Sequence, residues 1–354
     1  MVPRCLGTPL DDYVNRPDSH YAYQVLTDQT KHVENGYTVY ILNMTSQKWL
    51  TEKDSDRSIW WHYMAITVPD KLTITDTSFM YITGGSNTDG PPDPLGDEEV
   101  LMTSLFALGT GSIGAILKQV PNEHIRFYGD PKNKSRTEDG IIAYTWKHFI
   151  QYPTQPDWLL RNPMTKAAVR AMDTITDFAK KVSPQTNINK FMVAGASKRG
   201  WTTWTTAAVD KRVIACAPIV MDELNMVKNL HHHFRAYGGW TFAFSDYYEE
   251  DVTKNLDHPN TQGIADIVDP LTYKDRLTMP KMIISTGGDE FFLPDDSHYY
   301  YDQMEGITYL RITPNAEHSL ILHYAQTVLN LRSFFLSVVE NRKMPKMTWT
   351  RNEV

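Results

Sequence analysis

Cysteine is scarce in this chain, whose 354 residues include only Cys5 and Cys216. So few cysteines exclude a small scaffold stapled by several disulfides. Cys216 lies in the apolar run 213–220, where we expect a buried thiol. A hydrophobic core must therefore hold the fold together, and the length allows one large domain with insertions or two ordinary ones.

Long apolar runs and basic clusters are missing as well. No stretch approaches the roughly 18 uninterrupted apolar residues of a membrane-spanning helix, and the first residues lack the apolar core of a signal peptide. The formal net charge is -7, without the clustered basic surface that binds phosphates. We therefore expect no membrane span and no nucleic-acid partner. A small molecule or a peptide is the expected substrate, and the oligomeric state is open.

Metal-binding patterns are weak. His231, His232 and His233 are consecutive in the sequence. Consecutive side chains do not converge on one ion, and neither a cysteine nor a spaced set of carboxylates accompanies them. We expect no metal and no other cofactor.

What the sequence does contain is an alternation of apolar strands and amphipathic helices. Three β-rich runs separated by turn signals predict an antiparallel meander near the start, over 37–42, 60–68 and 77–83. Further strands alternate with helices, which implies right-handed βαβ crossovers and a mainly parallel sheet. These strands are predicted at 112–120, 190–195, 213–220, 280–288 and 307–313. The fold class is therefore α/β, with a central sheet flanked by helices in a single domain over 1–354.

The alternation stops between residues 224 and 279. This segment has three histidines, a Gly-Gly pair and an acidic run, and no strand rhythm. Long insertions in compact domains are usually lids or binding loops. We therefore interpret 224–279 as a cap over the active site.

Ser197 occupies the turn between a predicted strand and a predicted helix. A strand, a sharp turn and a helix form the nucleophile elbow of α/β-hydrolases, in which the serine Oγ is exposed. Gly195 fits because a Cβ two residues before the serine would crowd the turn. The match to G-x-S-x-G is imperfect, since Arg199 stands two residues after the serine and the glycine follows at Gly200.

Three residue types of a catalytic triad follow predicted strands in hydrolase chain order. These are Ser197, Asp289 and His318. Because the carboxyl ends of parallel strands meet at one crevice, we expect the three to converge there. In this hypothesis His318 accepts the proton of Ser197, and Asp289 orients the imidazole. Other aspartates also follow strands or share the loop of Asp289, so the acid is left open among Asp289 and three alternatives, Asp222, Asp295 and Asp296.

Two backbone amides are candidates for the oxyanion hole. One belongs to Lys198, the residue after the nucleophile, and the other to Gly85 or Ser86 in a glycine-rich turn. Glycines in such a turn free amides to face an anion.

Several motifs together resemble the PhoPQ-activated pathogenicity-related family, which includes secreted autocrine proliferation repressor proteins of social amoebae. They cover 60–63, 81–87, 138–146, 163–173 and 195–201. The resemblance implies an α/β-hydrolase fold and a secreted or periplasmic location. The elbow is also similar to the Gly-x-Ser-Arg-x-Gly of glucuronoyl esterases, where the basic residue helps to hold the oxyanion, and this similarity assigns the same role to the Lys198 side chain.

The leading functional hypothesis is a serine hydrolase that forms an acyl-enzyme with an ester or an amide. Within it, Glu249 and Glu250 resemble the paired glutamates with which dipeptidyl peptidases hold a free amino terminus. Asp222 and Trp201 are further candidate substrate contacts. The competing hypothesis is a non-catalytic secreted signalling protein that keeps the hydrolase fold for partner binding.

Overall fold

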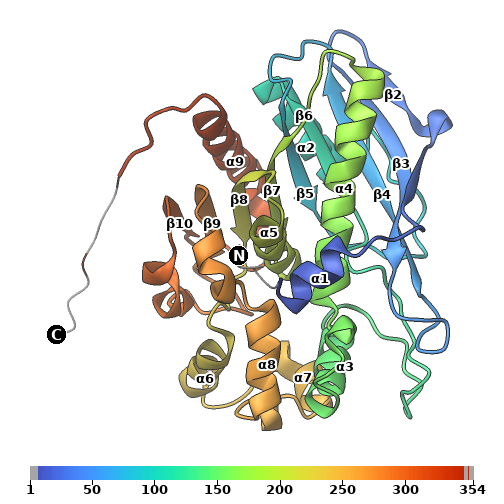
Figure 1. The fold of residues 1–354 in the computed structure, drawn as a ribbon. Coiled ribbons are helices and arrows are strands. Elements are labelled where there is room, and N and C mark those ends of the chain that lie inside the picture. Colours follow the sequence, from blue (N-terminus) through green and yellow to red (C-terminus); the bar gives the residue numbers. More distant parts are fainter. Residues whose placement is uncertain (1–6, 347–349, 351–354) are drawn as a thin grey trace, which may run out of the picture.

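A computed structural model describes residues 7–346 and 350 (Figure 1). In this part of the chain, ten strands form one sheet in the order β1-β3-β4-β6-β5-β7-β8-β9-β10, with β2 paired to β3. The strands are β1 (Ala22–Val25), β2 (Lys31–Val33), β3 (Tyr37–Lys48), β4 (Ile59–Pro69), β5 (Thr77–Ile82), β6 (Ile113–Leu117), β7 (Lys190–Ala196), β8 (Val213–Ile219), β9 (Lys281–Thr286) and β10 (Thr308–Thr313).

The sheet is mainly parallel, as predicted, and its antiparallel part lies at the N-terminal end. Strands β6, β5, β7, β8, β9 and β10 are parallel neighbours, whereas β1, β3 and β4 pair antiparallel. The predicted three-strand meander is wrong for its third strand. Strand β4 pairs with β6, and β5 lies between β6 and β7. Nearly all residues of β5 are buried, which is typical of a central parallel strand covered on both faces.

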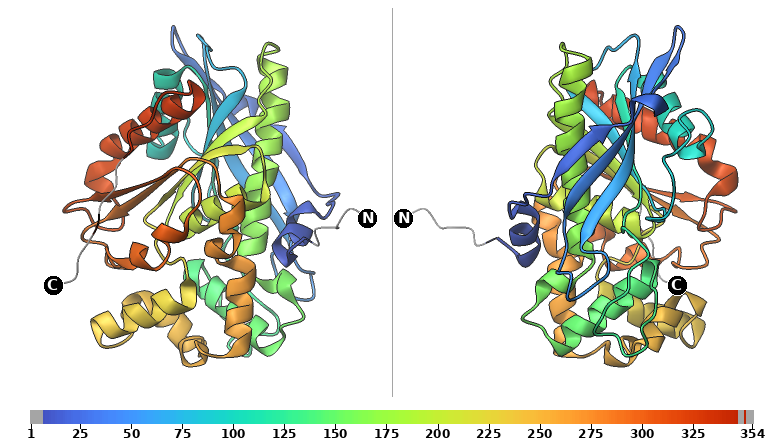
Figure 2. Two further views of the ribbon diagram at one scale, coloured as in Figure 1. Left: turned by 60° about the vertical axis from the view of Figure 1, so that its left-hand side comes forward. Right: turned by 90° about the vertical axis from the view of Figure 1, so that its right-hand side faces the viewer.

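Helices cover both faces of the sheet (Figure 2). Helices α4 (Arg161–Val182) and α5 (Lys198–Val209) pack on one face, and α2 (Glu98–Thr110) and α9 (Tyr324–Val339) pack on the other. On the second face Phe79 of β5 stacks on Phe106 of α2 with ring centroids 4.1 Å apart. The burial of both helix pairs against the sheet gives the three layers of an α/β protein.

A further group of helices lies together at one end of the sheet (Figure 1). It comprises α3 (Glu138–Gln151), α6 (Met226–Tyr237), α7 (Ser245–Glu249) and α8 (Pro259–Val268), while α1 (Pro9–Asn15) packs against α4. Helices α6, α7 and α8 fill the segment 224–279 between β8 and β9. The role of this segment as a lid stays a prediction.

Two other expectations concern burial and membrane contact. Cys216 is fully buried in β8, and burial raises the pKa of its thiol to about 12; Cys5 lies outside the described residues. No helix in the described part of the chain is long and apolar enough to cross a membrane.

Candidate active site

Ser197 forms the sharp turn between β7 and α5. Its backbone has φ 56° and ψ -127°, a conformation that L-residues rarely adopt and that clusters at functional sites. Gly195 makes this turn possible, because a Cβ there would lie 2.7 Å from the carbonyl oxygen of Arg199 and 2.9 Å from that of Ile82. The local geometry is therefore that of a nucleophile elbow.

Gly200 explains the departure from the G-x-S-x-G pattern. A Cβ at this position would lie 2.7 Å from the Cβ of Met221 and 3.0 Å from the carbonyl oxygen of Ile219. The close approach of α5 to β8 thus falls at residue 200 and not at residue 199. The guanidinium of Arg199 instead contacts the carbonyl oxygen of Val120 and the carboxylate of Glu138.

His318 and Asp289 form a hydrogen-bonded pair. The Nδ1 atom of His318 lies 3.0 Å from each carboxylate oxygen of Asp289. Oδ1 of Asp289 also accepts the amides of Phe291 and Phe292 at 2.8 and 3.0 Å, which fixes the carboxylate. The two residues follow the adjacent parallel strands β9 and β10, so the sheet brings their loops together.

The three alternative acids have other partners. Asp222 is buried, accepts hydrogen bonds from Ser285 and Tyr300, and has its pKa raised to about 6 by burial. Asp295 lies 3.2 Å from His232. Asp296 accepts the Leu293 amide at 2.8 Å, and burial, followed by the charge of Asp222, raises its pKa to about 9. None of the three carboxylates hydrogen-bonds to His318, so the geometry favours Asp289.

Ser197 and His318 lie at the junction of two cavities. The first, about 230 Å³, is mainly apolar and lies between the end of β5, α2 and α9. The second, about 320 Å³, is lined by charged and aromatic side chains from α3, α5, α7 and the loop after β9. The described contacts include no hydrogen bond between Ser197 Oγ and His318, and such bonds are often long in unliganded enzymes.

The glycine-rich turn lies at the site, but the residue beside Ser197 is Gly84, one position before the predicted Gly85. Thr83 and Gly84 line the apolar cavity beside Ser197. Ser86 is wrongly assigned, since its amide donates to Asp89 at 2.7 Å and is therefore occupied. Gly85 is not among the residues that line either cavity. Lys198 is the first residue of α5, so its amide has no partner within the helix.

Sequence comparison matches residues 10–353 to the family described as PhoPQ-activated pathogenicity-related protein. The chain belongs to this family. Autocrine proliferation repressor protein A of Dictyostelium discoideum, a similar protein, is 42% identical to it over 351 residues, which are 99% of this chain and 69% of that protein. The family resemblance predicted from the motifs is thereby confirmed.

Solved structures show the fold of this family member. Two acetyl xylan esterases, from Paenibacillus sp. R4 and Thermoanaerobacterium sp. JW/SL YS485, each align with a TM-score of 0.60 at 12% identity. The alignments cover 92% of this chain, and 91% and 93% of those chains. At this identity the likeness concerns the fold, and it confirms the predicted α/β-hydrolase fold.

Two family motifs meet beside the elbow, where basic side chains of α5 contact acidic ones of α3. Lys198 Nζ lies 2.9 Å from a carboxylate oxygen of Glu138 and 2.9 Å from one of Asp139. Burial would raise the pKa of Glu138, but the charges of Arg199 and Lys198 lower it to about 2. The Lys198 ammonium is thus held by two carboxylates, which leaves its amide as the better candidate for oxyanion binding in this family member.

Two residues of the polar cavity, Arg161 and Glu223, were not predicted from the sequence, because no motif marks them. Arg161 at the start of α4 is buried, and its guanidinium lies 4.1 Å from the centre of the Trp201 ring. Its Nη1 donates to the carbonyl oxygen of Lys198 at 3.0 Å, while Nε has no hydrogen-bond partner. Glu223 also lines this cavity, and burial raises its pKa to about 8. Trp201, a predicted contact, lines the cavity and donates to the carbonyl oxygen of Val268.

The structure gives the glutamate pair other partners, which disfavours the predicted role in binding an amino terminus. Glu250 is 2% exposed and is neutralised by Arg136 at 2.8 Å and Lys147 at 2.9 Å. Glu249 pairs with Lys134 at 2.8 Å on the surface. Neither glutamate is among the residues that line the cavities at Ser197.

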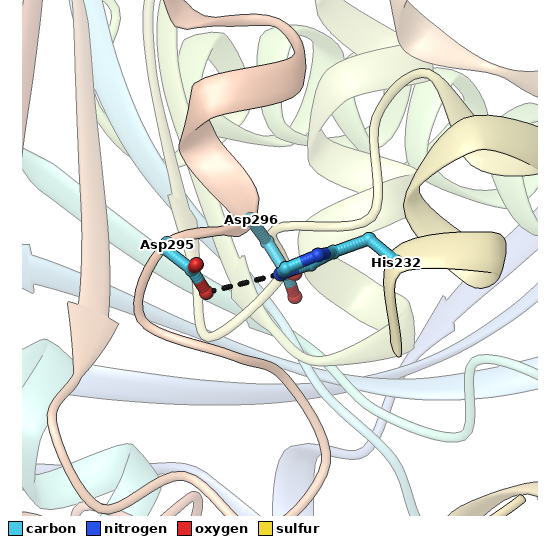
Figure 3. Close-up of side chains that lie close together, drawn as sticks. All are labelled: His232, Asp295 and Asp296. Atoms are coloured by element: carbon cyan, nitrogen blue, oxygen red, sulfur yellow. Dashed lines mark hydrogen bonds and ion pairs between the residues drawn. The ribbon is translucent and has the colours of Figure 1, made fainter. Parts of the chain in front are cut away.

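The three consecutive histidines diverge, as their spacing predicts. His231 contacts Asp257, and His233 contacts the hydroxyl of Thr241. His232 points to a different loop, where one ligand atom each from His232, Asp295 and Asp296 lie within 4.8 Å of one another (Figure 3). Of the described residues, these three form the one His/Cys/Asp/Glu group close enough to share a metal ion. The proximity of the two aspartates to His232 was not predicted from the sequence, because they lie in segments that are distant along the chain.

Proposed function

We propose that this protein is a carboxylic ester hydrolase that works through an acyl-enzyme on Ser197. The observation that carries the proposal is the strained elbow of Ser197 at a cavity that it shares with the His318–Asp289 pair. A hydroxyl, an imidazole and an orienting carboxylate on three loops at the carboxyl ends of the parallel strands are the groups that acyl transfer requires.

Each group has a definite part in the proposed reaction. The Asp289 carboxylate accepts a hydrogen bond from Nδ1–H of His318 and remains ionised, which leaves Nε2 as the base that removes the proton from Ser197. Oγ attacks the ester carbonyl, and the amides of Lys198 and Gly84 bind the oxyanion of the tetrahedral intermediate. His318 then protonates the leaving alcohol, and a water molecule hydrolyses the acyl-enzyme by the same steps in reverse order.

The two cavities support a substrate with one apolar and one polar part. The apolar cavity is lined by hydrophobic side chains, which include Phe79, Met102, Phe106, Leu320 and Leu331. Such a surface binds alkyl or aromatic groups by removing them from water. The polar cavity presents Arg161 and Glu223 to hydroxyl or amide groups. An ester is favoured over a peptide with a free amino terminus, because Glu250 is already neutralised.

Labelling with a fluorophosphonate tests the nucleophile directly. We expect one labelled site and turnover of p-nitrophenyl esters, and Ser197→Ala should abolish the labelling and lower kcat by roughly 10⁶-fold. Ser319→Ala is the matched control, since Ser319 lines the same cavity and contacts Glu317. A folded wild-type protein that is not labelled would overturn the proposal.

A second candidate function is extracellular signalling by binding, with export of the protein. The observation that favours it is the 42% identity to a protein whose name describes repression of autocrine proliferation. Purified wild-type and Ser197→Ala proteins can be added to growing Dictyostelium discoideum cells. If both slow proliferation equally, the effect is due to binding; if only the wild type does, hydrolysis is required.

A further inference from the structure

A cluster of one histidine and two aspartates joins two segments that are distant in the sequence. His232 belongs to α6, whereas Asp295 and Asp296 lie in the loop after β9, where Asp296 begins a short 3-10 helix. In Figure 3 the imidazole of His232 points toward the carboxylates of Asp295 and Asp296. Nε2 of His232 is 3.2 Å from Oδ1 of Asp295, and the closest ligand atoms of all three residues lie within 4.8 Å of one another.

Asp296 supplies independent evidence for a missing partner. Its side chain is 2% exposed, and its Oδ1 atom has no hydrogen-bond partner. Its Oδ2 atom accepts only the amide of Leu293, and the described residues include no ion pair of Asp296. An uncompensated buried carboxylate oxygen is costly, and buried charges are normally paired or bound to a metal.

The surroundings add negative charge. The charge of Asp222 acts on Asp296 electrostatically. The described ion pairs leave Asp222 without a lysine or arginine partner, since its carboxylate accepts hydrogen bonds from Ser285 and Tyr300. A cation at the cluster would therefore also be attracted by the Asp222 carboxylate.

We infer that His232, Asp295 and Asp296 form a binding site for a divalent transition-metal cation, Zn²⁺ or Mn²⁺. The imidazole selects for ions of this group over Ca²⁺ and Mg²⁺, which prefer all-oxygen sites. Asp295 is largely exposed, so the ion can enter from solvent. Water would complete the coordination, since three protein ligands leave positions open.

The site would connect the inserted segment to the catalytic loop. Helix α6 lies within 224–279, and the loop of Asp295 and Asp296 also carries Asp289. A bound ion would hold α6 against this loop and would stabilise the folded state by mass action. The inference is independent of the proposed hydrolysis, because binding can be measured without a substrate.

Metal titration of the tag-free, chelator-treated full chain tests the site. We expect saturable binding of one equivalent of Zn²⁺ or Mn²⁺, measured by calorimetry and metal analysis, with a rise in melting temperature. Asp296→Asn should weaken binding at least about tenfold. The asparagine oxygen can still accept the Leu293 amide, so the fold should survive, as circular dichroism of the metal-free variant can verify. His232→Ala is a second variant with the same expected loss.

His231→Ala is the matched control. His231 is the neighbouring residue on α6 and contacts Asp257, without a second carboxylate. Its removal should leave the affinity unchanged. Equal losses with His231→Ala and His232→Ala would indicate binding by surface histidines and overturn the site. Absence of saturable binding in the wild type, or binding of Ca²⁺ in place of both other ions, would overturn it too.

Discussion

Arg199 lies directly over Gly84. A Cβ at residue 84 would be 2.5 Å from Nη2 of Arg199 and 2.9 Å from its Cζ. The same guanidinium binds the carbonyl oxygen of Val120 and the carboxylate of Glu138, so it is held in place from two further sides. Arg199 therefore ties the elbow to the turn that carries the proposed second oxyanion donor.

This contact predicts the effect of Gly84→Ala. The added methyl group must displace either the guanidinium or the turn, which would move the Gly84 amide relative to Ser197. Displacements near 1 Å can cost on the order of 10²-fold in rate, so we expect kcat/KM for a p-nitrophenyl ester to fall by roughly 10–100-fold. Gly90→Ala is the control, because a Cβ at Gly90 meets nothing within 4 Å. Equal activities of the two variants would contradict a role for the turn.

Asp289→Asn tests the choice of acid. An asparagine would donate where the carboxylate accepts, which would favour the wrong tautomer of His318. We expect kcat to fall about 10⁴-fold with little change in structure. Asp222→Asn should keep kcat within a few-fold, since Asp222 contacts Ser285 and Tyr300 instead of the imidazole. A larger loss of kcat in Asp222→Asn than in Asp289→Asn would reverse the assignment.

The sequence was sufficient to predict the elbow and the candidate triad because local chemistry marks them. Ser197 follows an apolar strand and a glycine whose Cβ has no room, and His318 follows the last strand. Parallel strands bring such loop residues together without any detailed knowledge of packing. Glycine is required at residue 200 because a Cβ there would collide with Met221. Such a requirement is visible in the sequence as part of the elbow motif.

The remaining features depend on contacts between distant segments. The pairing of β5 with β6 and β7 is decided by burial on both faces, which an apolar run of six residues does not distinguish from a meander strand. Ser86 was assigned to the oxyanion hole because the capture of its amide by Asp89 is invisible in a glycine-rich pattern. Arg161 has no local signal, since its burial beside Trp201 arises from the packing of α4 on α5.

Substitutions in the glutamate pair can test whether these residues stabilise the fold or bind a substrate. Glu250→Gln removes a buried partner of Arg136, and breaking such a pair should lower the free energy of unfolding by roughly 3 kcal/mol. Asp130 remains bound to Arg136 at 2.9 Å, which keeps the loss from being larger. Glu249→Gln, at an exposed pair, should change stability by less than about 0.5 kcal/mol. Urea denaturation measures both. A selective rise in KM for free-amine peptides without loss of stability would restore the recognition role.

The buried carboxyl of Glu223 should make the free energy of unfolding depend on pH. Burial, opposed by Arg161, raises the pKa of this carboxyl from 4.5 to about 8. The folded state therefore binds a proton more tightly than the unfolded state. The stabilisation is fully present below about pH 4.5 and is lost as the pH rises through about 8, with an upper value of about 5 kcal/mol from the shift.

Glu223→Gln isolates this contribution, because glutamine mimics the protonated acid at every pH. The variant should match the wild type near pH 5 and be more stable than it by up to several kcal/mol near pH 9, measured by urea denaturation at both values. Glu34→Gln, at an exposed acid, is the control and should follow the wild type throughout. If the wild type and Glu223→Gln lost stability in parallel between pH 5 and pH 9, Glu223 would be charged in the folded protein, with Arg161 compensating its burial.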